Sequence, residues 1–104
     1  MIKVTYCIGM NDKNTLKQEF AKSDFIIEFD KIFKDYTVYE AQDRFTNRLG
    51  EITFERSLIV TTFIDECTET TLKQHLQHNC SILKEKLNQE SILVEVTEPK
   101  VIFC

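Results

Sequence analysis

Apolar and polar residues alternate at the start of the chain. Every second residue from Ile2 to Met10 is apolar, and Lys3, Thr5 and Cys7 stand between them. Strict alternation over this length is typical of a β-strand with one buried face. The pattern therefore predicts a strand over residues 2–10, followed by a polar turn at 11–14.

Two later segments show the spacing of amphipathic helices instead. Over 24–35 apolar residues recur every three or four positions, and Ser23 is a suitable N-cap. Thr68 is a suitable N-cap for a second helix that ends near Asn88. Its apolar stripe consists of Leu72, Leu76, Cys80, Leu83 and Leu87.

Three further segments have the composition of strands. Residues 36–46 and 51–65 are rich in Tyr, Val and Thr, and the turn at 47–50 contains Gly50, which suits a left-handed backbone position. The pair predicts an antiparallel hairpin. Residues 91–97 form a last strand before the single proline.

The resulting order, β-α-β-β-α-β, predicts an α+β fold of the ferredoxin-like type. Such a fold has a four-stranded antiparallel sheet with two helices on one face. A chain of 104 residues is normally one domain, so we expect a single domain over 1–104.

A four-residue hairpin loop would place Thr46 opposite Glu51 and so sort the side chains into two faces. The face under the helices would hold Tyr39, Ala41, Phe45, Ile52, Phe54, Leu58, Val60 and Ile64. The opposite face would carry an apolar patch of Val38, Ile59 and Phe63 that no helix of this chain covers. We therefore expect self-association through the open sheet face, most simply as a homodimer.

The hairpin also carries the polar residues that resemble a binding site. The candidate ligand-binding residues are Tyr36, Glu40, Gln42, Arg44, Arg48, Glu55, Arg56 and Ser57. Arginine is a fork of donors suited to a carboxylate or phosphate, so these residues favour a small anionic, nucleotide-like ligand. Arg56 falls on the helix-covered face in this register, which leaves three interpretations: the sheet margin, a pair with Asp43, or a bulge near Glu55.

Composition narrows the function further. With two glycines the chain has no glycine-rich phosphate loop, and a net charge of −4 gives no footprint for non-specific nucleic-acid binding. No export signal or membrane segment is visible, so we expect a cytoplasmic protein whose four cysteines are reduced packing residues. His75, His78 and Cys80 cannot converge on one ion from a single helix, so we expect no metal and no cofactor.

The hairpin residues resemble a known family. The run VYEAQDRF at 38–45, GEI at 50–52 and ERS at 55–57 are similar to the DUF3574 family of small ferredoxin-like bacterial and phage proteins. Asp43 and Phe45 stand where that family tends to have glycine and tryptophan. The resemblance implies the fold and no reaction, because the function of the family is not established.

Three functions follow from these features. The first is a non-catalytic homo-oligomeric binding protein, for example a phage protein that sequesters an anionic ligand. The second is an interaction module that inhibits a host protein, which fits the small size and the acidic charge. The third is an enzyme that uses Glu40, Glu55 and Arg56.

Overall fold

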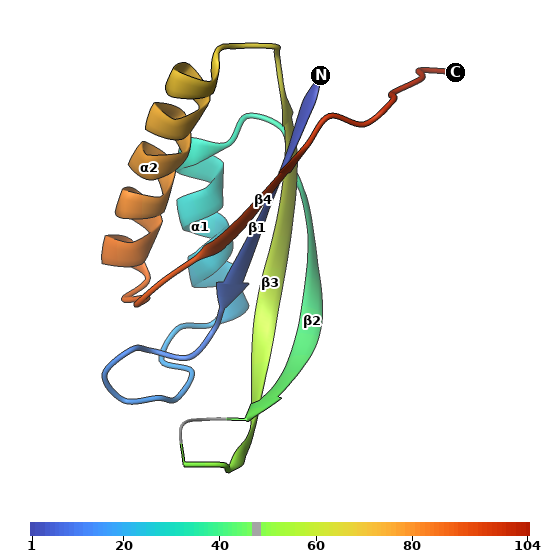
Figure 1. The fold of residues 1–104 in the computed structure, drawn as a ribbon. Coiled ribbons are helices and arrows are strands. Elements are labelled where there is room, and N and C mark those ends of the chain that lie inside the picture. Colours follow the sequence, from blue (N-terminus) through green and yellow to red (C-terminus); the bar gives the residue numbers. More distant parts are fainter. Residues whose placement is uncertain (47–48) are drawn as a thin grey trace.

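The computed structural model describes residues 1–46 and 49–104, and the candidate Arg48 lies outside them. Its elements, in chain order, are β1 (Ile2–Gly9), α1 (Lys22–Ile32), β2 (Thr37–Thr46), β3 (Ile52–Ile64), α2 (Glu69–Lys86) and β4 (Leu93–Thr97). The strands form one antiparallel sheet in the order β2-β3-β1-β4, and both helices lie on the same side of it (Figure 1). The predicted ferredoxin-like architecture is confirmed.

The core lies between the sheet and the two helices. Alternate β1 residues are buried there, and Val4, Tyr6 and Ile8 are each at most 1% exposed. Phe29 of α1 and Leu83 of α2 pack against them from the helix layer. The alternation of β1 therefore sorts its side chains as predicted, since one face of the strand meets helices and the other meets no other element.

The two helices differ in how they begin. Thr68 caps α2 as predicted, because its side chain accepts the Thr71 N–H at 3.2 Å. For α1 the predicted cap is wrong: the N-cap is Ala21, two residues before Ser23. Ala21 has no capping side chain, and the Asp24 carboxylate accepts its backbone N–H at 2.8 Å.

The hairpin register differs by one residue from the prediction. Thr46 pairs with Ile52 instead of Glu51, so the connection is one residue longer than a four-residue loop. Gly50 has φ +78°, which confirms its left-handed conformation. Because side chains alternate between faces, this shift turns every β2 residue to the face opposite the predicted one. The β3 residues keep their predicted faces.

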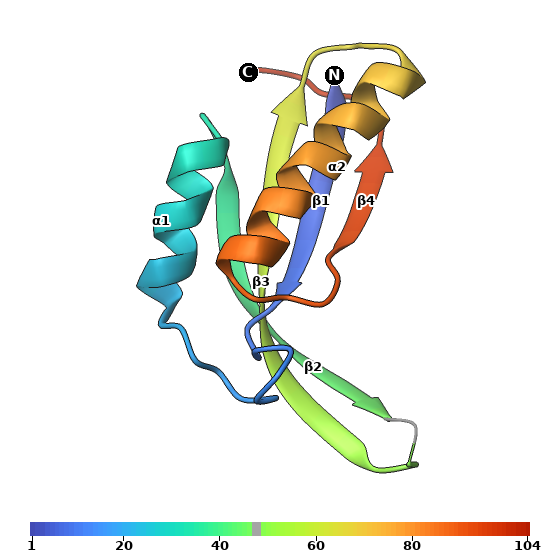
Figure 2. The same cartoon turned by 90° about the vertical axis from the view of Figure 1, so that its left-hand side faces the viewer.

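The shift corrects several core assignments. Tyr39 and Phe45 are 55% and 44% exposed rather than buried, and Ala41 lies on the uncovered face with them. Val38 faces the helices and packs against the core. Ile52 and Phe54 do face the helix side, yet they are also exposed, because the end of the hairpin extends past both helices (Figure 2).

The structure bears on two further expectations, one about membrane segments and one about the cysteines. Within residues 1–46 and 49–104, neither helix combines the length and the hydropathy that a membrane crossing requires. All four cysteines are free thiols, but Cys67 and Cys104 are exposed, so the prediction that they are packing residues is wrong for these two.

Candidate acidic site on the open sheet face

The structure divides the predicted site residues between the two faces of the sheet. Glu55 and Ser57 lie on the open face, which no helix covers. The other described candidates lie on the helix side, and these are Tyr36, Glu40, Gln42, Arg44 and Arg56. The prediction of one shared site is therefore wrong, because it depended on the four-residue loop and the register that came with it.

Two of the helix-side candidates, Glu40 and Arg56, are paired with each other. The Arg56 guanidinium donates to Glu40 at 2.8 Å, and Lys22 of α1 lies 3.6 Å from the same carboxylate. The hydrogen bond from Arg56 is the main reason that the pKa of Glu40 lies below its ordinary value. These contacts resolve the predicted ambiguity of Arg56: it lies on the helix side of the inner strand β3, in a continuous ladder, and is paired with Glu40 rather than Asp43.

Tyr36 likewise contacts α1. Its hydroxyl donates to Asp30 at 2.7 Å, and its ring meets Phe29 edge-on at a centroid distance of 6.0 Å. The hydrogen bond to Asp30 is the largest cause that raises the pKa of Tyr36 to about 12. Its hydroxyl is thus directed at a helix rather than at the open sheet face.

Three polar side chains gather on the open face near the hairpin, and we call them the acidic cluster: Asp43, Glu55 and Ser57. Asp43 on β2 is the direct partner of Glu55 on β3, so two carboxylates stand side by side on neighbouring strands. Ser57 is buried, and its hydroxyl donates to Asp43. The half-buried Glu55 accepts the backbone N–H of Asn11 at 3.1 Å.

The acidic character extends to the neighbouring strands. Glu95 on β4 is the partner of Thr5 on β1, which places this carboxylate on the same face. Burial is the main cause that raises the pKa of Cys7, and the negative charges of Glu95 and Asp43 raise it further. Lys3, near the start of β1, is the single cation among the described strand residues of this face. A negative surface of this kind attracts a cationic ligand, not the predicted anion.

Apolar side chains lie on the part of the open face that is farther from the hairpin loop. Tyr39 stands opposite Ile59 in the β2–β3 ladder, and Phe63 lies further along β3 with 46% of its surface exposed. Of the predicted patch, Ile59 and Phe63 are therefore placed as expected, and Val38 is not. We call Tyr39, Ile59 and Phe63 the apolar patch.

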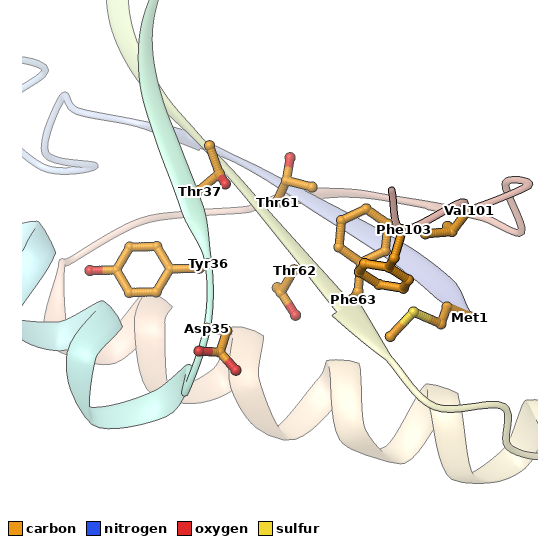
Figure 3. A pocket seen from close by; sticks show the side chains of 9 residues that line it. All are labelled: Met1, Asp35, Tyr36, Thr37, Thr61, Thr62, Phe63, Val101 and Phe103. Carbon is orange, nitrogen blue, oxygen red and sulfur yellow. The ribbon is translucent and has the colours of Figure 1, made fainter.

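A separate pocket of about 380 Å³ lies at the end of the sheet away from the acidic cluster (Figure 3). Its lining residues are Met1, Asp35, Tyr36, Thr37, Thr61, Thr62, Phe63, Val101 and Phe103. The rings of Phe63 and Phe103 form its apolar wall, while the Tyr36 hydroxyl is directed away from them. The acidic cluster does not contribute to this pocket.

Sequence reasoning found two members of the acidic cluster, Glu55 and Ser57, and considered Asp43 only as a partner of Arg56. It missed Asn11, whose N–H contacts Glu55, and Glu95 on the same face. The sequence distance between Asn11 and Glu55 hides their contact, because only the β1–β3 ladder brings them together. The correct hairpin register would have placed Asp43 beside Glu55.

Comparison with solved structures finds enzymes of the same fold. The chain is similar to a phage SAM lyase in complex with S-methyl-5′-thioadenosine, with a TM-score of 0.67, 19% identity, and coverage of 93% of this chain and 80% of that one. The apo form of a phage SAM lyase matches with a TM-score of 0.66 and 17% identity, over 92% and 78% of the two chains. No family model and no curated protein matches the sequence. Membership of the DUF3574 family therefore stays a prediction.

These neighbours contradict the expectation of a non-catalytic binding protein that sequesters an anionic ligand. They are lyases, and the match extends over nearly the whole of this chain. Arg44 and Arg56, which were predicted to hold the anion, lie together on the helix side, away from the carboxylates of the open face. The expectation of a small ligand fits the neighbour that holds S-methyl-5′-thioadenosine.

Proposed function

We propose that this protein is an enzyme that cleaves S-adenosylmethionine (SAM) and releases S-methyl-5′-thioadenosine. The supporting observation is the match to phage SAM lyases over 93% of the chain. The charge of the open face supports the same substrate, since SAM carries a sulfonium and an ammonium cation. Asp43, Glu55 and Glu95 supply negative charge on this face.

The reaction needs little from the protein beyond binding and orientation. The bond between the sulfonium sulfur and the methionine Cγ breaks, and its electron pair stays on sulfur, which becomes a neutral thioether. A lyase adds no water, so the four-carbon fragment completes its own valence. It does so by a bond from its carboxylate to Cγ or by a double bond after loss of a Cβ proton.

In this proposal Glu55 is the residue that faces the cationic end of the substrate. Its carboxylate is half-buried and lies on the open face, where a bound ligand can reach it. Asp43 is directed by the hydroxyl of Ser57 and adds a second negative charge beside it. Interactions of fixed charges in a partly desolvated site are stronger than in water, which is how such a surface favours one orientation of the substrate.

We further propose that the active form is a homo-oligomer in which a second copy covers the open face. The apolar patch exposes two large aromatic side chains, Tyr39 at 55% and Phe63 at 46%. An uncovered sheet face leaves any small ligand largely in water, whereas enclosed sites bury most of the ligand surface. A second sheet placed over the patch would enclose the neighbouring acidic cluster.

The proposal is tested by incubating the purified protein with SAM and measuring S-methyl-5′-thioadenosine by liquid chromatography. Glu55→Gln and Glu40→Gln form a matched pair, because the two carboxylates lie on adjacent strands but on opposite faces. We expect Glu55→Gln to lower kcat/KM by about 10²–10³-fold, as is found when one electrostatic contact to a reacting group is removed.

Glu40→Gln is expected to retain nearly full activity, since it alters only ion pairs at the surface. Absence of S-methyl-5′-thioadenosine with the wild-type protein would refute the proposed reaction. Equal loss of activity in both variants would refute the placement of the site on the open face.

A further inference from the structure

We infer that Gly9 and Gln89 are positioning residues that together hold the Glu55 carboxylate in place over β1. The effect of this arrangement on catalysis rests on the proposed function, whereas the arrangement itself can be measured without it. Glu55 lies near the start of β3, just beyond the last residue pair of the β1–β3 ladder, and its side chain reaches the end of β1 and the start of the following loop.

Gly9 provides the space that this side chain occupies. A Cβ atom at position 9 would lie 2.1 Å from Glu55 Oε1 and 2.9 Å from its Cδ. Gly9 is a strand residue without a positive φ, so its backbone does not demand glycine. The absence of a side chain here is explained by the carboxylate that lies against it.

The loop after β1 provides the hydrogen-bond donor. The Asn11 N–H donates to Glu55 Oε1 at 3.1 Å, and the carbonyl of the same residue accepts from Gln89 Nε2 at 3.0 Å. Gln89 is buried, at 6% exposure, and its own N–H closes the end of α2 by donating to Lys84 O at 2.9 Å. The C-terminus of α2 therefore fixes the residue that orients Glu55.

Further hydrogen bonds around Asp12 and Asn88 hold the same loop. The carboxylate of Asp12 accepts Asn88 Nδ2 at 2.6 Å and the N–H of Asn14 at 2.8 Å. The Lys13 N–H donates to the Asn88 carbonyl at 3.0 Å. Because two consecutive residues after α2 contact consecutive loop residues, the Asn11 N–H has little freedom to turn away from Glu55.

The test measures the position of the carboxylate first and activity second. In the wild-type protein the NMR resonance of the Asn11 amide proton should move when Glu55 is protonated on acidification, and this movement should be lost in Glu55→Gln. Gly9→Ala should also abolish it, because the carboxylate has to move by about 1 Å or more to avoid the new methyl group. Gln89→Ala removes the donor to the Asn11 carbonyl and adds no atom near Glu55, so it tests the support of the loop separately.

For SAM cleavage, a displacement of this size is expected to lower kcat about 10²-fold in Gly9→Ala with little change in KM. Gln89→Ala should also lower kcat. The controls are Thr5→Ala, on the same strand and face, and Gln77→Ala, on the exposed side of α2. Both should behave as the wild-type protein does.

The inference is overturned if folded Gly9→Ala and Gln89→Ala retain the wild-type pH response of Asn11, or if they lose it and keep full kcat. A wild-type protein that shows the Asn11 response but does not cleave SAM refutes the proposed function and supports the arrangement around Glu55. The two failures are thereby distinguished.

Discussion

A buried hydrogen bond joins α2 to the centre of the sheet, and its removal should destabilise the fold measurably. Asn79 Nδ2 on α2 donates to the Tyr6 hydroxyl at 3.1 Å, and the two residues are 4% and 1% exposed. The same amide nitrogen lies 3.4 Å from His75 Nε2, which is a longer contact. Tyr6→Phe keeps the ring, which packs on Phe33 at 5.1 Å, and removes only the acceptor.

The cost follows from the burial of the unpaired group. A buried donor that loses its partner costs about 1–3 kcal/mol, so we expect Tyr6→Phe to lower the free energy of unfolding by about 1.5 kcal/mol. For a domain of about 100 residues this corresponds to a fall in Tm of about 6–12 °C. Asn79→Leu leaves the Tyr6 hydroxyl unpaired instead and should cost a similar amount.

The double variant separates this interaction from other effects. Tyr6→Phe with Asn79→Leu removes both polar groups, so its loss should be smaller than the sum of the single losses by about 1 kcal/mol. Urea unfolding followed by far-ultraviolet circular dichroism measures all four proteins. Additive losses, within the error of the extrapolation, would refute the view that this contact joins α2 to β1.

Three further predictions concern titration and assembly. The hydrogen bonds from Asn88 and the loop lower the pKa of Asp12, so its stabilisation is present above its unfolded pKa and is lost as the pH falls through its folded pKa. Acidification should therefore reduce the stability of Asp12→Asn less than that of the wild type; a parallel decline would contradict this. The Tyr36 phenol should ionise near pH 12, and in Asp30→Ala its pKa should fall towards the ordinary value of about 10 while burial still holds it above that value, measured as the ultraviolet difference from Tyr36→Phe. For the proposed oligomer, Phe63→Lys should give a smaller species than the wild type in analytical ultracentrifugation, and an unchanged mass would count against the apolar patch as the interface.

The local patterns of the sequence were sufficient for the fold. Alternation in β1, the helical spacing of α2 and the Thr68 cap each depend on residues close together in the chain, and each is confirmed. The order of the elements then leaves few ways to arrange four strands and two helices. The start of α1 was missed because Ala21 has no side chain that marks a helix start, and the Asp24 carboxylate accepts the backbone N–H of Ala21 from within the helix.

Local sequence patterns could not predict which residues share the site. One additional residue in the hairpin connection turned β2 over, separated Glu55 from Glu40, Gln42 and Arg44, and brought Asp43 beside it. A register depends on the competition between whole strands for burial, and a hairpin end that extends past the helices has no core to reveal which face is inner. The sequence by itself determined which segments are strands and helices. Only the tertiary structure decided which carboxylates share a face, because Asn11, Gly9 and Glu55 meet through pairing between strands far apart in the chain.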